Sequence, residues 1–347
     1  MTTVEKGNTN SAPRHRNSAS SPSRSDLTQS ATDPSELVEI FAGQRTAFDR
    51  KPAPTLGQRR ATLAKLARLI EQNRLLLVEA ANSDFGVRAS FETEMSEIVG
   101  TISIIRYMRS HLRSWMAPRR RSVSMWYMPA KNRVEPRPLG VVGVVSPWNF
   151  PLHLALIPAA TALAAGNRVM LKVSEFTPRT SAVLKRLIEE NFSPDTFYVT
   201  DGGGEVASRF TTLPFDHLIF TGSTQVGKIV AKAAAENLTP VTLELGGKSP
   251  VIVDKNYSLE RAATTVAWAK VFNGGQVCVA PDYVLVPRGR EKEFAVAARQ
   301  AARKLYPKVA GNPQYTAILN QRHYDRITGY ITEARARDLE VITAENP

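Results

Sequence analysis

The chain has 347 residues, a formal net charge of +13 and a single cysteine. Hydrophobic residues make up 43% and charged residues 22% of it, as is typical of a globular protein with a sizeable core. No apolar run is long enough to span a bilayer, and the N-terminus lacks the apolar segment of a secretory signal. One cysteine excludes an intrachain disulfide, so we expect a reducing compartment, most simply the cytoplasm.

The excess of positive charge raises the question of a nucleic-acid partner. The densest basic cluster is Arg119-Arg120-Arg121, yet no interleaved aromatic pattern and no DNA-reading motif accompanies it. We interpret the excess as a solvated basic face and expect no nucleic-acid partner. Attraction of anionic ligands, including nucleotide cofactors, is the alternative.

The N-terminal third is predicted to consist of a tail, three helices and a hairpin. Residues 1–33 are rich in Ser, Thr, Asn, Pro and Arg, which predicts a disordered tail ahead of a fold that starts near Pro34. Helical periodicity predicts three helices, Ser35–Asp49, Leu56–Ala81 and Phe91–Met116. The alternating, proline-flanked segment Ser122–Arg137 predicts an extended hairpin.

Strand-like and helix-like segments alternate from residue 139 onward. The β-branched run Leu139–Val145 is typical of a strand buried on both faces. Further strands are expected at Arg168–Val173, Thr196–Val199, His217–Phe220, Val241–Leu243 and Val251–Val253. Helices are expected at Leu152–Ala165, Thr177–Asn191 and Thr224–Asn237. This alternation predicts a doubly wound parallel α/β sheet, which would bind ligands at the carboxyl ends of its strands.

Two turns after predicted strands suit a nucleotide. The turn Gly222–Gly227 (GSTQVG) opens a helix, so its backbone N–H groups could approach a pyrophosphate. A simple N-cap is the alternative, and the G-x-G-x-x-G fingerprint is absent there. Lys172 and Glu175 could hold the hydroxyl groups of an adenosine ribose, and the carboxylate favours NAD over NADP. A surface ion pair is the alternative for these two residues.

Three further segments carry groups suited to catalysis. Asn149 lies between Pro147 and Pro151, which fix the backbone, and its amide is a suitable oxyanion donor. Glu244 is expected at a strand end, where a carboxylate can act as general base. Cys278 follows two glycines that leave its sulfur accessible for nucleophilic attack. The plain alternatives are a capping Asn, a solvated strand end and an inert core cysteine.

In this order the segments resemble the aldehyde dehydrogenase superfamily across nearly all of residues 34–347. The strings PWNFP, FTGST, ELGGKSP and GGQVCVAPDYV carry the resemblance. The strings WMAPRRR, SEFTPRTS, LPFDHLIFTGST and APDYVLVP are most similar to the coniferyl aldehyde dehydrogenase branch. The resemblance implies a doubly wound cofactor domain over residues 34–243, with an oligomerisation hairpin at about 122–138, and part of an α/β catalytic domain over residues 244–347.

The resemblance also implies a mechanism. The Cys278 thiolate would add to an aldehyde carbonyl, the Asn149 amide and the Cys278 N–H would hold the oxyanion, and Glu244 would activate the water that hydrolyses the thioester. The implied cofactor is NAD, with NADP an alternative, and no metal is implied. The implied partners are a small aldehyde and a second copy of the chain. The residues implied to bind the cofactor are Trp148, Lys172, Glu175, Gly222, Ser223, Gly227, Leu245 and Gly246.

The sequence departs from the family pattern at two positions and at its end. Val173 stands where Pro is usual and Val277 where Thr is usual, both next to the working groups. Family members continue beyond the position of Pro347 with a Glu-x-Phe-Gly-Pro segment and a strand that joins the hairpin. We therefore expect a fragment or a decayed copy with an open apolar face and an open sheet edge. A truncated, inactive NAD-binding or interaction protein is the alternative, and an acylating reductase is another, against which Glu244 argues.

Overall fold

The computed structural model describes residues 33–51 and 53–344, so the tail expected over residues 1–33 lies outside the described residues except for Asp33. The described residues belong to one structural unit, Ala31–Pro347. The helices are α1 (Pro34–Arg50), α2 (Leu56–Gln72), α3 (Arg74–Asp84), α4 (Ser90–Thr93), α5 (Gly100–Trp115), α6 (His153–Ala165), α7 (Pro178–Glu189), α8 (Gly204–Thr211), α9 (Thr224–Ala235), α10 (Leu259–Val271), α11 (Glu291–Leu305) and α12 (Gln321–Ala336). The strands are β1 (Arg119–Arg121), β2 (Asn132–Val134), β3 (Val141–Val145), β4 (Arg168–Lys172), β5 (Phe197–Thr200), β6 (His217–Gly222), β7 (Val241–Leu245), β8 (Ser249–Ile252) and β9 (Pro281–Leu285).

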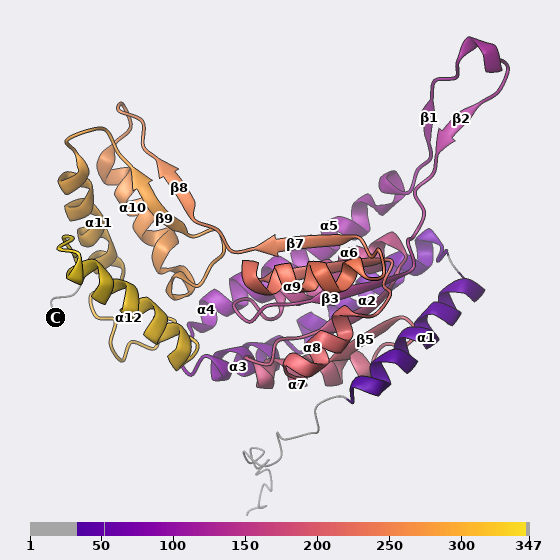
Figure 1. Ribbon diagram of the computed structural model, residues 1–347, viewed down its shortest axis with the longest axis horizontal. Helices are drawn as coiled ribbons and strands as arrows, with labels where there is room; N and C mark the ends of the chain where they lie inside the picture. Colours follow the sequence, from indigo (N-terminus) through magenta and orange to yellow (C-terminus); the bar gives the residue numbers. More distant parts are fainter. Residues whose placement is uncertain (1–32, 52, 345–347) are drawn as a thin grey trace, which may run out of the picture. The chain divides into compact units, whose positions relative to one another are not determined.

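Five parallel strands form the main sheet, in the order β5-β4-β3-β6-β7. Figure 1 labels β3, β5 and β7 of this sheet. The chain enters at β3, adds β4 and β5 on one side, and then adds β6 and β7 on the other. The strand order therefore reverses between β3 and β6, where open α/β sheets bind ligands at the carboxyl ends of the strands. The predicted doubly wound sheet is confirmed.

The β-branched strand β3 explains why both faces of this sheet are covered. All five of its residues are buried. Val142 and Val144 join the core under α2, α5, α6 and α7, whereas Val141 and Val145 join the core under α1, α8 and α9. Gly143 leaves room on the second face, because a Cβ there would lie 2.7 Å from the Phe215 ring. Alternating side chains thus give the sheet two helical layers.

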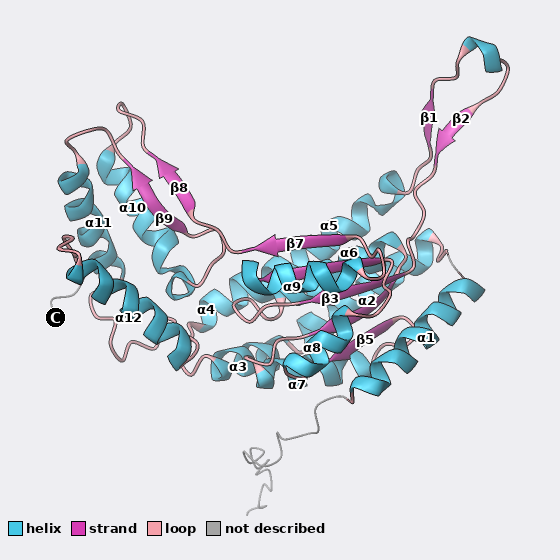
Figure 2. Cartoon of the chain, viewed as in Figure 1, coloured by secondary structure: helices cyan, strands magenta, loops and turns pink. Residues whose placement is uncertain are grey.

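A second, two-stranded sheet consists of β8 and β9, which pair in parallel (Figure 2). The strand expected at Val251–Val253 is present as β8 (Ser249–Ile252) but lies outside the main sheet, and its partner β9 was not predicted. Helices α10 and α11 supply Leu259 and Phe294 to the core of this sheet. Ile252, Tyr283 and Leu285 are exposed.

Two of the predicted helices are interrupted. The segment Leu56–Ala81 breaks at Asn73, whose side-chain amide donates to the Leu69 carbonyl oxygen and ends α2. The segment Phe91–Met116 contains a π-helical stretch, Glu94–Val99, between α4 and α5. Apolar periodicity continues through both interruptions, so it predicted single helices.

A hairpin with short strands is present, but its first strand β1 precedes the predicted segment Ser122–Arg137, so the predicted start was wrong. β1 and β2 pair antiparallel, Arg119 with Val134, and a 3-10 turn, Met125–Tyr127, lies at the tip (Figure 1). The three arginines of β1 are exposed. In the described part of the chain, no helix has the length and apolar character that crossing a bilayer requires.

Candidate functional site

The carboxyl edge of the main sheet brings the predicted segments together. β3 ends at Val145, β4 at Lys172, β6 at Gly222 and β7 at Leu245. All these strands are parallel, so their carboxyl ends meet at one edge. The PWNFP, SEFTP, GSTQVG and ELGG segments leave the sheet at or beside these ends.

The turn after β6 places a helix N-terminus at this edge. Ser223 caps α9, because its Oγ accepts a hydrogen bond of 3.3 Å from the Val226 N–H. A Cβ on the buried Gly227 would lie 2.7 Å from Leu245 Cδ2, so this glycine lets α9 pack closely against β7. The capping alternative is thus confirmed for Ser223. It is compatible with anion binding, since the first turn of a helix has more N–H groups than one cap can satisfy.

Lys172 and Glu175 form an ion pair of 2.7 Å. The Lys172 side chain is only 3% exposed, whereas that of Glu175 is 40% exposed. The alternative of a surface ion pair is therefore wrong for Lys172. A buried ammonium group at the end of β4, next to a partly exposed carboxylate, presents both a donor and an acceptor to a hydroxyl-bearing ligand.

Contacts of Trp148 and Asn149 hold the loop after β3 in place. The Trp148 ring packs 4.8 Å from the His323 ring and 6.4 Å from the Phe85 ring, measured between centroids. Asn149 Nδ2 donates to the Gln276 carbonyl oxygen over 3.0 Å. The Asn149 carbonyl oxygen in turn accepts from Asn273 Nδ2 over 3.1 Å. The oxyanion-donor candidate is therefore tied directly to the loop that carries Cys278.

A buried ion pair also contacts this loop. Arg88 and Glu97 approach to 2.6 Å with both side chains fully buried. Glu97 Oε2 accepts from the Leu152 N–H over 2.7 Å, and Arg88 Nη2 lies 3.4 Å from the Asn149 carbonyl oxygen. Burial raises the pKa of the Glu97 carboxyl group, and the Arg88 charge and backbone donors act against that rise. The π-helical stretch carries Glu97 into this position.

A left-handed turn precedes Cys278. Asn273, Gly274 and Gly275 have φ values of 51°, 61° and 77°. A Cβ on Gly274 would lie 2.6 Å from the Thr316 carbonyl oxygen, so both the backbone angle and the space require glycine there. This turn reverses the chain after α10 and leads it to Cys278.

The Gln276 side chain fixes the loop from its other side. Its Nε2 donates to the Asn273 and Ala317 carbonyl oxygens over 3.0 and 2.9 Å. Its Oε1 accepts from the Leu319 N–H over 3.0 Å. Cys278 follows two residues later and is exposed, with a free thiol. Its backbone N–H makes no hydrogen bond within residues 33–51 and 53–344, which leaves it available to an oxyanion.

The ELGG segment passes beside the cysteine. An added Cβ on Gly247 would lie 3.5 Å from the Cys278 carbonyl oxygen. Glu244 lies in β7, one residue before the end of the strand, and pairs with Thr221 of β6. The prediction that Glu244 ends the strand is therefore wrong by one position. Its carboxyl group is exposed and has no hydrogen-bond or ion-pair partner among the described residues. Gly246 is exposed, with nothing near an added Cβ.

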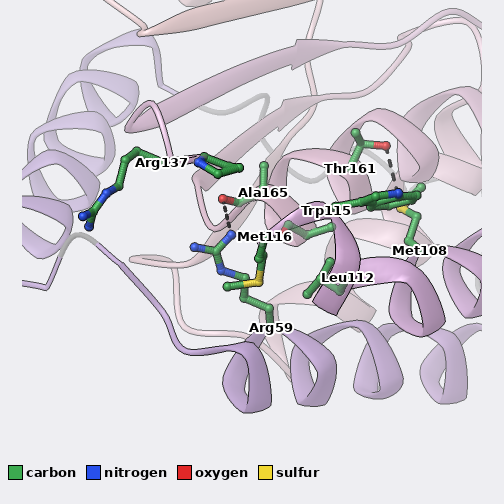
Figure 3. Close-up of a pocket in the computed structure, with 10 residues that line it drawn as sticks. Arg59, Met108, Leu112, Trp115, Met116, Arg137, Thr161 and Ala165 are labelled. Carbon is green, nitrogen blue, oxygen red and sulfur yellow. Dashed lines mark hydrogen bonds between the residues drawn. The ribbon is translucent and has the colours of Figure 1, made fainter. Parts of the chain in front are cut away.

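One surface pocket of about 200 Å³ lies elsewhere (Figure 3). Residues of α2, α5 and α6 and of the segment after the hairpin line it, and none of the predicted site residues is among them. In it, Arg59 Nη1 donates to the Ala165 carbonyl oxygen over 2.6 Å and so caps the C-terminus of α6. No group of three or more His, Cys, Asp or Glu side chains suited to a metal ion gathers in the described part of the chain.

Comparison with known proteins decides the family. The family model described as "Aldehyde dehydrogenase family" matches residues 18–346. The chain belongs to the aldehyde dehydrogenase family. A probable coniferyl aldehyde dehydrogenase of Pseudomonas aeruginosa is 45% identical over 316 residues, which cover 91% of this chain and 66% of that relative. The coniferyl aldehyde dehydrogenase of a Pseudomonas species is 44% identical over 304 residues, or 86% of this chain and 63% of the relative. The chain thus spans less than two thirds of the length of these relatives.

Solved aldehyde dehydrogenase structures share the fold. The substrate-bound state of Staphylococcus aureus AldH matches with a TM-score of 0.82 and 35% identity, covering 86% of this chain and 66% of that one. The Mycobacterium tuberculosis aldehyde dehydrogenase complexed with NAD+ matches with a TM-score of 0.80 and 27% identity, covering 91% and 66%. The expected aldehyde dehydrogenase-like α/β fold is therefore confirmed.

In the folded chain, the loops of Asn149 and Cys278 are contacted by residues that the sequence analysis did not single out. Asn273 and Gln276 stand in the NGGQVC string, so the cysteine motif itself was a signal for them. Arg88 lies in the loop between α3 and α4, and Glu92 and Glu97 lie in the helical segment after it, with no such string in either. Their contacts with the two loops become visible only in the folded chain.

Proposed function

We propose that this site oxidises an aldehyde to a carboxylic acid with NAD, using Cys278 as nucleophile. The observation that carries the proposal is the hydrogen bond from Asn149 Nδ2 to the Gln276 carbonyl oxygen, two residues before Cys278. It fixes an amide donor against the loop of an exposed, free thiol. This pairing of a nucleophile with an oxyanion donor is what acyl-transfer chemistry requires.

In the proposed mechanism, Cys278 sulfur forms a bond to the aldehyde carbon, and the carbonyl electron pair moves to oxygen. The second N–H of the Asn149 amide and the Cys278 N–H stabilise this oxyanion. When the carbonyl re-forms, the carbon loses a hydride and a thioester remains. Glu244 takes a proton from water, the hydroxide adds to the thioester carbon, and the carbon–sulfur bond breaks to release the acid and the thiolate.

The residues at the sheet edge fit a dinucleotide, and NAD would supply the hydride acceptor when bound. The N-terminus of α9 at Ser223 suits a pyrophosphate. The Lys172–Glu175 pair suits the ribose hydroxyl groups, and the Glu175 carboxylate would repel a 2′-phosphate. This charge favours NAD, with NADP as the alternative. We propose Trp148, Gly222, Gly227, Leu245 and Gly246 as the remaining cofactor-binding residues.

The proposed substrate class is an aromatic aldehyde such as coniferyl aldehyde, or an aliphatic one. Relatives with 43–45% identity bear the name coniferyl aldehyde dehydrogenase, which supports the aromatic class. We further propose residues 34–243 as the cofactor domain and residues 244–347 as part of the catalytic domain. A homodimer through the β1–β2 hairpin, a cytoplasmic location and the absence of a nucleic-acid partner complete the proposal.

Replacement of the nucleophile tests the function. We expect the chain to form NADH from coniferyl aldehyde and NAD, and Cys278→Ala to abolish this while it still binds NAD in a calorimetric titration. NADH formation that survives in Cys278→Ala would contradict the role of the cysteine. An unmodified chain that binds NAD but forms no NADH with any aldehyde would favour the inactive binding protein.

A further inference from the structure

A buried acid from outside the predicted site reaches the cysteine loop. Glu92 lies in α4 and is only 8% exposed. Its Oε2 accepts a hydrogen bond of 3.2 Å from the Asn273 N–H and one of 2.7 Å from Thr316 Oγ1. These contacts span 181 and 224 residues of sequence. One carboxyl oxygen therefore joins α4 to two segments from the C-terminal part of the chain.

The backbone that Glu92 holds is in an unfavourable conformation. Asn273 is a fully buried non-glycine residue with φ 51°, at the start of the left-handed turn. A left-handed conformation is rare for residues other than glycine, although asparagine adopts it more often than most, so surrounding contacts help to maintain it. The hydrogen bond from the Asn273 N–H to Glu92 is a contact of that kind.

Asn273 passes this restraint to the proposed reacting groups. Its Nδ2 donates to the Asn149 carbonyl oxygen over 3.1 Å and lies 3.3 Å from the Gln276 carbonyl oxygen. The same Gln276 oxygen accepts from Asn149 Nδ2. The Asn273 side chain thus connects the loop that carries Asn149 to the loop that carries Cys278. Glu92 in turn holds the backbone of Asn273.

We infer that Glu92 is a positioning residue that sets the Asn149 amide against the Cys278 sulfur by holding the Asn273 backbone. The inference rests on the proposed function, because it assigns Glu92 to the same site. Glu92 itself does not serve as the base, since its Oε2 already accepts from two donors and the carboxyl group is buried. It acts through Asn273, and its effect should fall on the step that builds the oxyanion.

Two tyrosines lie near the Glu92 carboxyl group. Tyr315 and Tyr306 pack edge-to-face near it, with ring centroids 4.9 Å apart. Burial raises the pKa of both phenols, and the Glu92 charge adds to the rise.

The test compares Glu92→Gln with Glu94→Gln. Gln keeps the shape of the side chain but removes the charge. Glu94 lies two residues further on, is partly exposed and pairs with the exposed Arg74, so it is a matched control. Thr316→Val is a second variant, which keeps the carboxyl group and removes one of its two donors. It keeps the inference testable if Glu92→Gln does not fold.

Two reactions of Cys278 separate positioning from general damage. Alkylation by iodoacetamide requires only an exposed thiol, whereas acylation by p-nitrophenyl acetate also requires a placed oxyanion donor. We expect Glu92→Gln to slow acylation by about tenfold or more, because small displacements of reacting groups are costly. Alkylation should stay within about twofold, Thr316→Val should slow acylation less, and Glu94→Gln should change neither reaction.

Amide hydrogen exchange supplies a readout that needs no reaction. We expect faster exchange in the peptide covering residues 272–279 of Glu92→Gln, and no change in Glu94→Gln. Unchanged acylation with unchanged exchange, or equal loss of acylation and alkylation, would overturn the inference. If the unmodified chain oxidises no aldehyde, the proposed function fails alone, because acylation and exchange still decide the role of Glu92.

Discussion

At the scale of single residues, we propose two separate tasks for the Asn149 side chain. An amide NH2 group offers two N–H bonds, and the Gln276 carbonyl oxygen takes one of them over 3.0 Å. The other is free to meet an oxyanion, with its direction fixed by the first. A hydrogen-bond donor held in advance costs little reorganisation when charge develops, which is why such donors contribute strongly to rate.

Removal of this amide should therefore slow the chemical step selectively. We expect Asn149→Ala to lower kcat for aldehyde oxidation by about 10²–10³, the usual effect of losing one oxyanion donor. The Kd for NAD should change little. Steady-state kinetics and an NAD titration check this, with the exposed loop residue Asn256→Ala as control. A fall in NAD affinity with kcat intact would place Asn149 in the cofactor site instead.

At the scale of elements, β3 shows how one strand serves two cores. Its even-numbered valines face one helical layer and its odd-numbered valines face the other, and Gly143 leaves space for the buried Phe215 ring. The strand then delivers the PWNFP loop to the edge of the sheet. Packing on both faces of β3 thus fixes the direction in which Asn149 leaves the sheet.

A methyl group at Gly143 should disturb this packing. Its Cβ would lie 2.7 Å from the Phe215 ring and 2.8 Å from Leu218 Cδ1, both buried. We expect Gly143→Ala to lower the free energy of unfolding by about 1–3 kcal/mol, as overpacking of a core does. Urea denaturation measures it, against Gly204→Ala in α8, where an added Cβ meets nothing within 4 Å. Equal stability of the two variants would contradict this account of the sheet.

The elements also show what the sequence could and could not predict. The buried strand of Leu139–Val145 and the order of the site motifs were predictable, because periodicity and short strings are local signals. The separate β8–β9 sheet was not, since periodicity does not specify which strand pairs with which. Glu92 and Glu97 gave no local signal either, because their partners lie 181 and 55 residues away.

At the scale of the whole molecule, stability should depend on pH through buried histidine. His153 begins α6, and its Nδ1 lies 2.9 Å from Thr101 Oγ1. Burial lowers the pKa of His153 below its ordinary value of 6.5. The folded state therefore favours the neutral ring. The resulting stabilisation is complete above pH 6.5 and is lost as the pH falls through the lowered folded-state pKa.

We therefore expect the free energy of unfolding to fall between about pH 7.5 and pH 5, with part of that fall absent in His153→Gln. The glutamine has no proton to gain in this range and can still bond to Thr101. Urea denaturation at several pH values gives the comparison. The same slope in both proteins would exclude His153 as a source of the pH dependence.

The central claim is that Cys278 becomes acylated by the aldehyde as NADH forms. The most direct measurement is the intact mass of a Glu244→Gln chain, quenched after mixing with coniferyl aldehyde and NAD. This variant lacks the carboxylate that we propose as the base for thioester hydrolysis. The account predicts NADH formation equal to the amount of chain and one acyl group on the peptide that contains Cys278. NADH formed without an adduct, or an adduct on another residue, would contradict it.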